Sequence, residues 1–305
     1  MTTQMNRGIK WTDSQGNEMI ISRDIWRAEV LPRALADHWN KAELLFLDVM
    51  MGIEDGFREE MLPFAKRLLT LEGESERAVT CLAYIQINTG KVEDAKAALD
   101  RYLATHPPCI RILYTLAQAH KETGELDALR KTLRQALLLD PNEPSILDWW
   151  YTFHKDTSGE ARAEKALREV AEERGSWLAE VWLSLTLLQD RKIDEAIAIY
   201  RRILGTAAHQ GLALQEISGH LGQAGYYQEA LDLVFPLYDP ALHGPLTGLN
   251  LLKVCGDAGA IELGQKLIER MLQQDWPHIR ATLLKSRDGF DRPLDDFLSA
   301  RYISN

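Results

Sequence analysis

The sequence predicts an all-α fold, a solenoid built from helix-turn-helix units. One observation is that apolar and turn residues recur every 34 positions over most of the 305 residues. A second is that glycines stand at the same place in successive repeats, where one helix ends and the next begins. A third is the composition of 46% hydrophobic and 26% charged residues, typical of a folded chain. Repeat arrays grow by adding units, so the number of domains cannot be inferred from the chain length here.

The repeat is clearest between residues 76 and 143. Leu82-Ala83 is followed 34 residues later by Leu116-Ala117, and small residues of this kind allow two helices to cross closely. Glycine supplies the left-handed backbone that ends a helix without a Cβ clash. The glycines in step with the period are Gly56, Gly90, Gly124, Gly225 and Gly259.

The pattern resembles the tetratricopeptide repeat, a 34-residue unit with small residues at positions 8 and 20, a turn near 15 and proline near 32. The resemblance covers about three quarters of the chain and is poorest at residues 144–176. It implies a right-handed superhelical α-solenoid of about six units within residues 42–277. The windows lie near 42–75, 76–109, 110–143, 144–176, 177–210, 211–244 and 245–277.

The two ends differ from the repeats. Residues 9–21 predict a small hairpin, and Ser22 predicts the start of a helix that Pro32 breaks. At the other end, a helix is expected at about 278–287, followed by a short one carrying Leu294, Phe297 and Leu298. Because solenoid ends need covering, residues 1–41 and 278–305 are interpreted as caps. Docking of residues 1–21 onto another molecule stays open.

Motifs for chemistry are missing from the sequence. There is no GxGxxG, GxxxxGK[ST], GxSxG or HExxH motif. The three cysteines form no CxxC pair, and the eight histidines stand far apart. We therefore expect a protein that is not an enzyme and holds no metal or cofactor, although one sequence does not reveal a nonlocal catalytic pair.

The charge pattern limits the partners. A net charge of −10 with mixed signs throughout disfavours nucleic acid. No apolar run approaches the roughly 18 residues that a membrane span requires, and the N-terminus lacks a secretory signal. These features predict a cytoplasmic location.

The resemblance also implies where a partner would bind, because positions 2, 5, 9, 12 and 13 of each first helix line the inner face. Its N-terminal half would be cationic and aromatic, whereas Leu178, Val181, Leu188 and Leu249 would make the middle apolar. Such a face suits a peptide with an acidic end and a hydrophobic stretch. The candidate residues are Arg77, Thr80, Tyr84, Asn88, Arg111, Tyr114, Gln118, Lys121, Leu185, Gln215 and Lys253.

Three functions follow from this interpretation. The first is a scaffold or adaptor that binds a protein or peptide segment in the concave groove. The alternative is a peptide-sensing regulatory receptor. Its relatives carry an effector module before the repeats, and we expect residues 1–41 to be too short to form one. The third is an enzyme on a helical scaffold. Formation of a homo-oligomer stays open, because an apolar groove can also be covered by a second copy.

Overall fold

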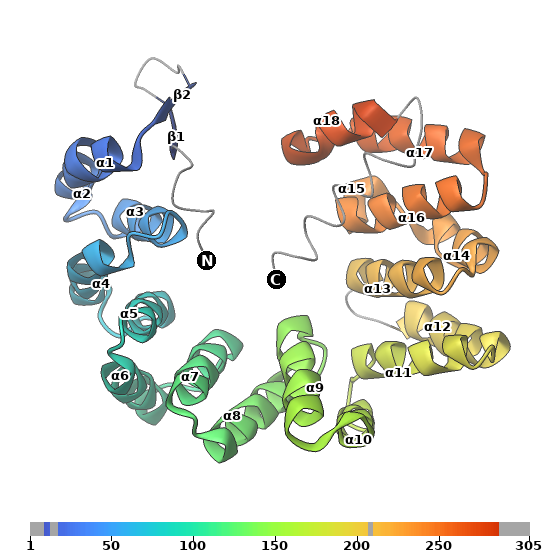
Figure 1. The fold of residues 1–305 in the computed structure, drawn as a ribbon, viewed down its shortest axis with the longest axis horizontal. Coiled ribbons are helices and arrows are strands. Elements are labelled where there is room, and N and C mark those ends of the chain that lie inside the picture. The colour runs from blue at the N-terminus through green and yellow to red at the C-terminus, as the bar shows by residue number, and fades with distance from the viewer. Residues whose placement is uncertain (1–8, 13–17, 207–209, 287–305) are drawn as a thin grey trace. The chain divides into compact units, whose positions relative to one another are not determined.

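The computed structural model describes residues 9–12, 18–206 and 210–286, which are mainly helical (Figure 1). The chain divides into two compact units, Met1–Asp140 and Pro141–Asn305. The boundary falls near the end of the predicted repeat window 110–143. The all-α fold class predicted from the sequence is therefore confirmed.

The N-terminal unit opens with the predicted hairpin. Strand β1 (Ile9–Thr12) pairs antiparallel with β2 (Glu18–Ile21), and Ile9 lies opposite Ile21. The turn at 13–17 lies outside the described residues. Ser22 then caps α1 (Arg23–Ile25), because its Oγ accepts a hydrogen bond from the Ile25 amide at 3.2 Å.

The predicted helix break at Pro32 is wrong. A π-helical turn, η1 (Trp26–Val30), leads directly into α2 (Leu31–His38), so the chain stays helical from Arg23 to His38. Within this turn the Leu31 amide donates to the Trp26 carbonyl five residues back. A wider turn of this kind accommodates a proline, whose ring would clash with an α-helical carbonyl and which has no amide proton to donate.

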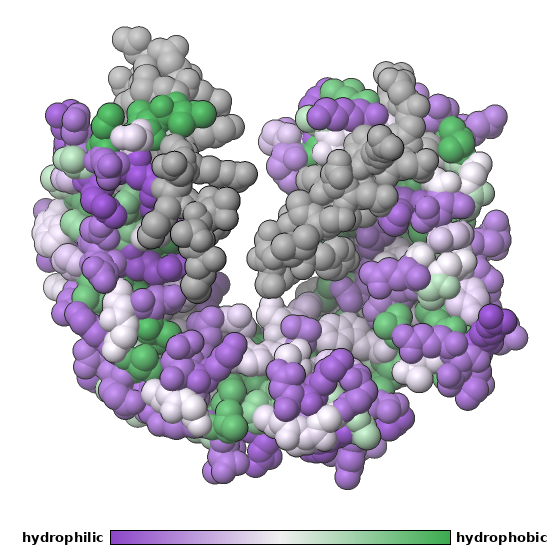
Figure 2. Space-filling model, in the orientation of Figure 1, coloured by the Kyte–Doolittle hydropathy of each residue, from purple (hydrophilic) through white to green (hydrophobic). Residues whose placement is uncertain are grey.

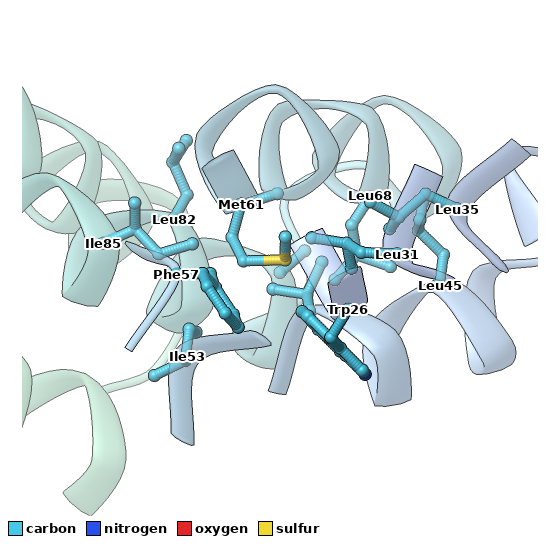
Figure 3. Close-up of a cluster of buried hydrophobic side chains, with 13 residues drawn as sticks. Trp26, Leu31, Leu35, Leu45, Ile53, Phe57, Met61, Leu68, Leu82 and Ile85 are labelled. Atoms are coloured by element: carbon cyan, nitrogen blue, oxygen red, sulfur yellow. The ribbon is translucent and has the colours of Figure 1, made fainter. Parts of the chain in front are cut away.

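Three helix pairs follow in this unit, and the two helices of each pair contact each other. Figure 3 shows the core of the first pair, where Trp26 stacks on Phe57 with ring centroids 4.7 Å apart. The preceding helices thus pack against the first pair through this cluster. The pairs are α3 (Ala42–Glu54) with α4 (Arg58–Glu72), α5 (Glu76–Asn88) with α6 (Val92–Thr105), and α7 (Ile110–Thr123) with α8 (Leu126–Leu139).

The turns within these pairs use the predicted glycines. Gly90 and Gly124 have φ of 76° and 72°, in the left-handed region. An L side chain is strained there, which explains glycine at these two positions.

The C-terminal unit begins with the window that departs from the repeat pattern. It nevertheless forms a helix pair, α9 (Pro144–Ser158) and α10 (Glu160–Ala171). Helix α9 continues to Ser158, and Gly159, with φ of 84°, links it to α10. Trp150 is buried, as expected of a core aromatic, and donates from Nε1 to the Ala166 carbonyl at 3.3 Å.

The remaining helices continue the pairing, with one irregular second helix. Helix α14 ends at Leu233, and Pro236 follows in a 3₁₀ turn, since proline cannot continue the α-helix. The predicted helix near 278–287 is present, whereas the one carrying Leu294, Phe297 and Leu298 lies outside the described residues. The elements are α11 (Leu178–Gln189), α12 (Ile193–Thr206), α13 (Gln210–Gln223), α14 (Tyr227–Leu233), η2 (Phe235–Leu237), α15 (Pro240–His243), α16 (Pro245–Asp257), α17 (Ile261–Leu272) and α18 (Pro277–Ser286).

Candidate partner-binding face

Helix α7 separates its apolar and polar side chains. Ile112, Leu113, Leu116 and Ala117 are buried in the N-terminal unit. The candidate residues lie three or four positions apart on another face, as residues sharing one side of a helix do. Arg111 and Lys121 are exposed, and Tyr114 and Gln118 are half-buried.

Helix α5, which contacts α7, carries four more candidates. Asn88 is exposed, whereas Thr80 and Tyr84 are half-buried. Thr80 Oγ1 donates to the Glu76 carbonyl at 2.7 Å, and Asn88 Nδ2 donates to the Tyr84 carbonyl at 2.8 Å. These polar groups are thus partly engaged by their own helix, while the Tyr84 ring borders the buried cluster.

Arg77 is engaged within the chain. Its guanidinium donates to both Glu43 and Glu72, with Nη1 2.7 Å from Glu43 Oε2 and Nε 2.9 Å from Glu72 Oε1. It also lies 5.1 Å from the centre of the Phe46 ring. Hydrogen bonding to Glu43, and then to Glu72, raises the pKa of Arg77. A partner's carboxylate would therefore have to compete with two carboxylates of this chain.

Arg111 is more accessible. Its Nη1 lies 3.4 Å from Glu76 Oε1, and 62% of its side chain is exposed. An exposed pair of this kind contributes little to stability. Arg111 is therefore better placed than Arg77 to bind an acidic group.

The C-terminal unit holds the other three candidates. Leu185 on α11 and Gln215 on α13 are half-buried, and Lys253 on α16 is exposed. Lys253 Nζ lies 3.6 Å from Asp257 Oδ2. The structure thus places each of these residues on the first helix of a pair.

The expected open apolar stretch is wrong for four leucine and valine positions. Leu178, Val181 and Leu249 have no exposed surface, and Leu188 is 2% exposed. These side chains fill the contacts between neighbouring helices of the C-terminal unit. The sequence shows that a helix has an apolar face, but it does not show whether another helix covers that face.

A polar pair on this unit was missed by the sequence interpretation. Trp182 Nε1 on α11 donates to Glu216 Oε2 on α13 at 3.1 Å. Burial raises the pKa of Glu216, and the Trp182 hydrogen bond opposes that shift. The sequence did contain a signal for this contact: Trp182 and Glu216 are 34 residues apart, so they occupy the same position in successive repeats.

The surface is mixed in character. Figure 2 shows hydrophilic residues over much of the visible face, interrupted by hydrophobic patches. On α3, Leu44, Leu47 and Met51 are 38%, 53% and 50% exposed and follow one another at helical spacing. An apolar stripe of this kind is a further feature that a partner can contact.

The described residues provide no assembled chemical centre. No group of three or more His, Cys, Asp or Glu is close enough to hold a metal ion within the described ranges. Burial raises the pKa of the Cys81 and Cys255 thiols to about 11, so both stay protonated at neutral pH. Among the helices that the structure describes, none has the length and apolarity to cross a membrane.

Comparisons with known proteins match residues 90–148 to the tetratricopeptide repeat. Curated protein sequences give no match. Three similar solved structures have low sequence identity. A tetratricopeptide repeat protein from Parabacteroides merdae ATCC 43184 has 15% identity and a TM-score of 0.39, with 81% of this chain and 99% of that chain covered.

The structure of Naa15/Naa10 bound to HypK-THB has 16% identity and a TM-score of 0.38, with 86% of this chain and 42% of that chain covered. YrrB, a tetratricopeptide repeat protein with an unusual peptide-binding site, has 12% identity and a TM-score of 0.32, with 79% and 99% covered. Residues 90–148 thus match the tetratricopeptide repeat, and they lie within a mainly helical fold.

Proposed function

We propose that the chain is an interaction scaffold that binds a protein or peptide segment on the exposed face of α7 and the neighbouring face of α5. The binding residues are Arg111, Tyr114, Gln118 and Lys121 from α7, with Tyr84 and Asn88 from α5. This assignment follows the face predicted from the sequence, with Arg77 in a supporting role.

The observation that carries the proposal is the division of α7 into two faces. One face is buried in the repeat core, and the other presents an exposed arginine one turn from a half-buried tyrosine. Arginine and tyrosine are enriched among the residues that dominate binding energy at interfaces. Arginine can also form two parallel hydrogen bonds with a carboxylate.

Arg77 has a different part in this proposal. Because Glu43 and Glu72 already accept its hydrogen bonds, Arg77 holds α5 against the end of α4 and the preceding first helix. We therefore expect its substitution to affect stability more directly than recognition.

The test uses partner capture from native lysate, followed by identification of the bound protein and measurement of its affinity. We expect the double variant Arg111→Ala/Tyr114→Ala to weaken binding of that partner by at least about tenfold, as loss of two interface anchors does. The matched control is Arg130→Ala, which removes an exposed arginine from the second helix of the same pair.

Equal affinities of the double variant and the Arg130→Ala control would overturn the assignment. Helical content and thermal unfolding of Arg130→Ala should match the unsubstituted chain, because Arg130 is exposed. The same measurements on the double variant show whether loss of the half-buried Tyr114 ring unfolds it. If the double variant loses binding because it unfolds, Arg111→Ala/Tyr114→Phe separates the two effects. This variant retains the ring and removes only the hydroxyl.

A further inference from the structure

The first helices of the C-terminal unit carry polar side chains at one repeat position. Trp182, Glu216 and Asn250 follow each other at intervals of 34 residues on α11, α13 and α16. Trp182 Nε1 donates to Glu216 Oε2 at 3.1 Å. Asn250 Nδ2 donates to the Gln215 carbonyl at 3.0 Å and to Ser218 Oγ at 3.1 Å. These contacts join three successive first helices.

Within the described residues, Glu216 lacks a counter-ion of the kind that two other acids of this unit have. Glu180 pairs with Arg202, and Asp257 pairs with Lys253. Within the described ranges, no lysine or arginine forms an ion pair with Glu216, which is half-buried. Its hydrogen bonds come from neutral groups, the Trp182 indole and the Gln215 side-chain amide. A carboxylate removed from water without a compensating charge is costly.

His220 lies one helical turn from Glu216 and does not supply that charge. Burial lowers the pKa of His220 to about 4, so the ring is neutral at pH 7. Its Nδ1 is also buried without a hydrogen-bond partner among the described residues. The surroundings of Glu216 thus offer neutral groups where a cation would be favourable.

The internal contact alone does not account for the charge of Glu216. A neutral glutamine oxygen could accept the same hydrogen bond from Trp182 and would not require burial of a charge. The fold therefore has no need for a carboxylate at this position. A carboxylate is, however, the acceptor that binds a guanidinium or ammonium group most strongly.

The geometry points to Glu216 as the acceptor for a cationic side chain of a bound partner, with Trp182 orienting the carboxylate. The indole ring adds an aromatic surface of the kind on which cations stack. Leu185, one turn beyond Trp182 on α11, is half-buried and would contact an apolar neighbour of the cation. This inference rests on the proposed scaffold function and assigns the C-terminal unit a basic segment of the partner.

The experiment titrates the full chain with a blocked peptide, acetyl-Ser-Leu-Arg-Leu-Ser-amide, and with its citrulline counterpart, which has nearly the same shape without the charge. The indole N–H resonance of Trp182 reports directly on the Glu216 contact, and Trp182→Phe assigns it. We expect the arginine peptide to shift this resonance and to bind at least about tenfold more tightly than the citrulline peptide.

Glu216→Gln is the informative variant. It should keep the free energy of unfolding at or above that of the unsubstituted chain, and it should lose the preference for arginine over citrulline. Glu195→Gln is the matched control, since it removes an exposed carboxylate from the second helix α12. This control should retain the preference.

Three outcomes would overturn the inference. The first is equal binding of the two peptides or no shift with either. The second is an arginine preference that survives Glu216→Gln. The third concerns the arginines that lie beyond the described residues, Arg287, Arg292 and Arg301. If replacing all three by glutamine shifts the Trp182 resonance and allows the peptide to bind, the cation that Glu216 binds comes from this chain and not from a partner.

The two proposals fail separately. If the chain shows no preference for the arginine peptide but Arg111→Ala/Tyr114→Ala still weakens partner binding, only the site at Glu216 is refuted. If that double variant captures the partner as well as the unsubstituted chain does and the arginine preference is present, only the assignment on α5 and α7 is refuted.

Discussion

Arg191 occupies the turn position at which the following repeats place Gly225 and Gly259. Its φ is 60°, and no other non-glycine residue among those described has a positive φ. The backbone of this turn is therefore set by the packing of α11 against α12, and the side chain tolerates it at an energetic cost.

Arg191→Gly should stabilise the chain by about 0.5–1 kcal/mol, because it removes the Cβ that is unfavourable in the left-handed region. Chemical denaturation would measure the free energy of unfolding. Arg191→Ala serves as the control, since it removes the charge and keeps the Cβ. Equal stabilities of the glycine and alanine variants would show that the turn is not strained.

At the scale of an element, the start of α11 depends on a residue two helices earlier. Asn142 Oδ1 accepts hydrogen bonds from the Trp177 and Leu178 amides at 2.8 and 2.9 Å, and its Nδ2 donates to the Gly175 carbonyl at 2.8 Å. One amide side chain thus satisfies backbone groups at a helix start that lack partners within the helix. The turn preceding α9 is thereby tied to the turn preceding α11.

Replacement Asn142→Ala should lower the stability of this region by about 1–2 kcal/mol, as expected for loss of a capping side chain. Hydrogen exchange of the Trp177 and Leu178 amides is the direct measurement, and both should exchange faster. Asn142→Asp keeps an acceptor oxygen and should protect the two amides better than alanine does. Unchanged exchange in the alanine variant would contradict this role.

At the scale of the whole molecule, many tertiary contacts repeat the period of the sequence. Arg77 contacts Glu43 and Trp182 contacts Glu216, and the partners of each pair are 34 residues apart. Such contacts connect equivalent positions on consecutive first helices. In a chain with net charge −10, they also decide which charges are compensated internally.

The Arg77 cluster makes stability depend on pH. Hydrogen bonding from Arg77 lowers the pKa of Glu72 below its usual 4.5. A carboxyl whose folded pKa is depressed stabilises the fold above its unfolded pKa and loses that contribution as the pH falls through the folded value. The stabilisation is therefore full at neutral pH and declines below about pH 4.5.

Arg77→Ala should reduce the free energy of unfolding by about 1 kcal/mol at pH 7, a value limited by partial exposure of the pair. Urea denaturation from pH 7 to pH 3 should show this difference shrinking in acid. The control Arg101→Ala removes a largely exposed arginine whose Nη1 is 3.7 Å from Glu74 Oε1, and it should change stability little at any pH. A difference for Arg77→Ala that is constant with pH would assign its effect to packing on Phe46 instead.

The sequence by itself determined the helices, most of their turns and the residues that share a helix face. Glycine conformation, helix capping by Ser22 and the 34-residue spacing act over a few neighbouring residues, so they can be read along the chain. The spacing of Arg111, Tyr114 and Lys121 likewise places them on one side of α7, whereas their role as a binding face is what the resemblance to the repeat family implies.

Only the tertiary structure decided which of those side chains remain available. Arg77 is held by Glu43 and Glu72, Val181 is covered by neighbouring helices, and Glu216 lies beside Trp182. These outcomes depend on how far each helix is rotated and shifted against the next. Local periodicity fixes the face of a helix, whereas the packing of whole helices fixes what that face meets.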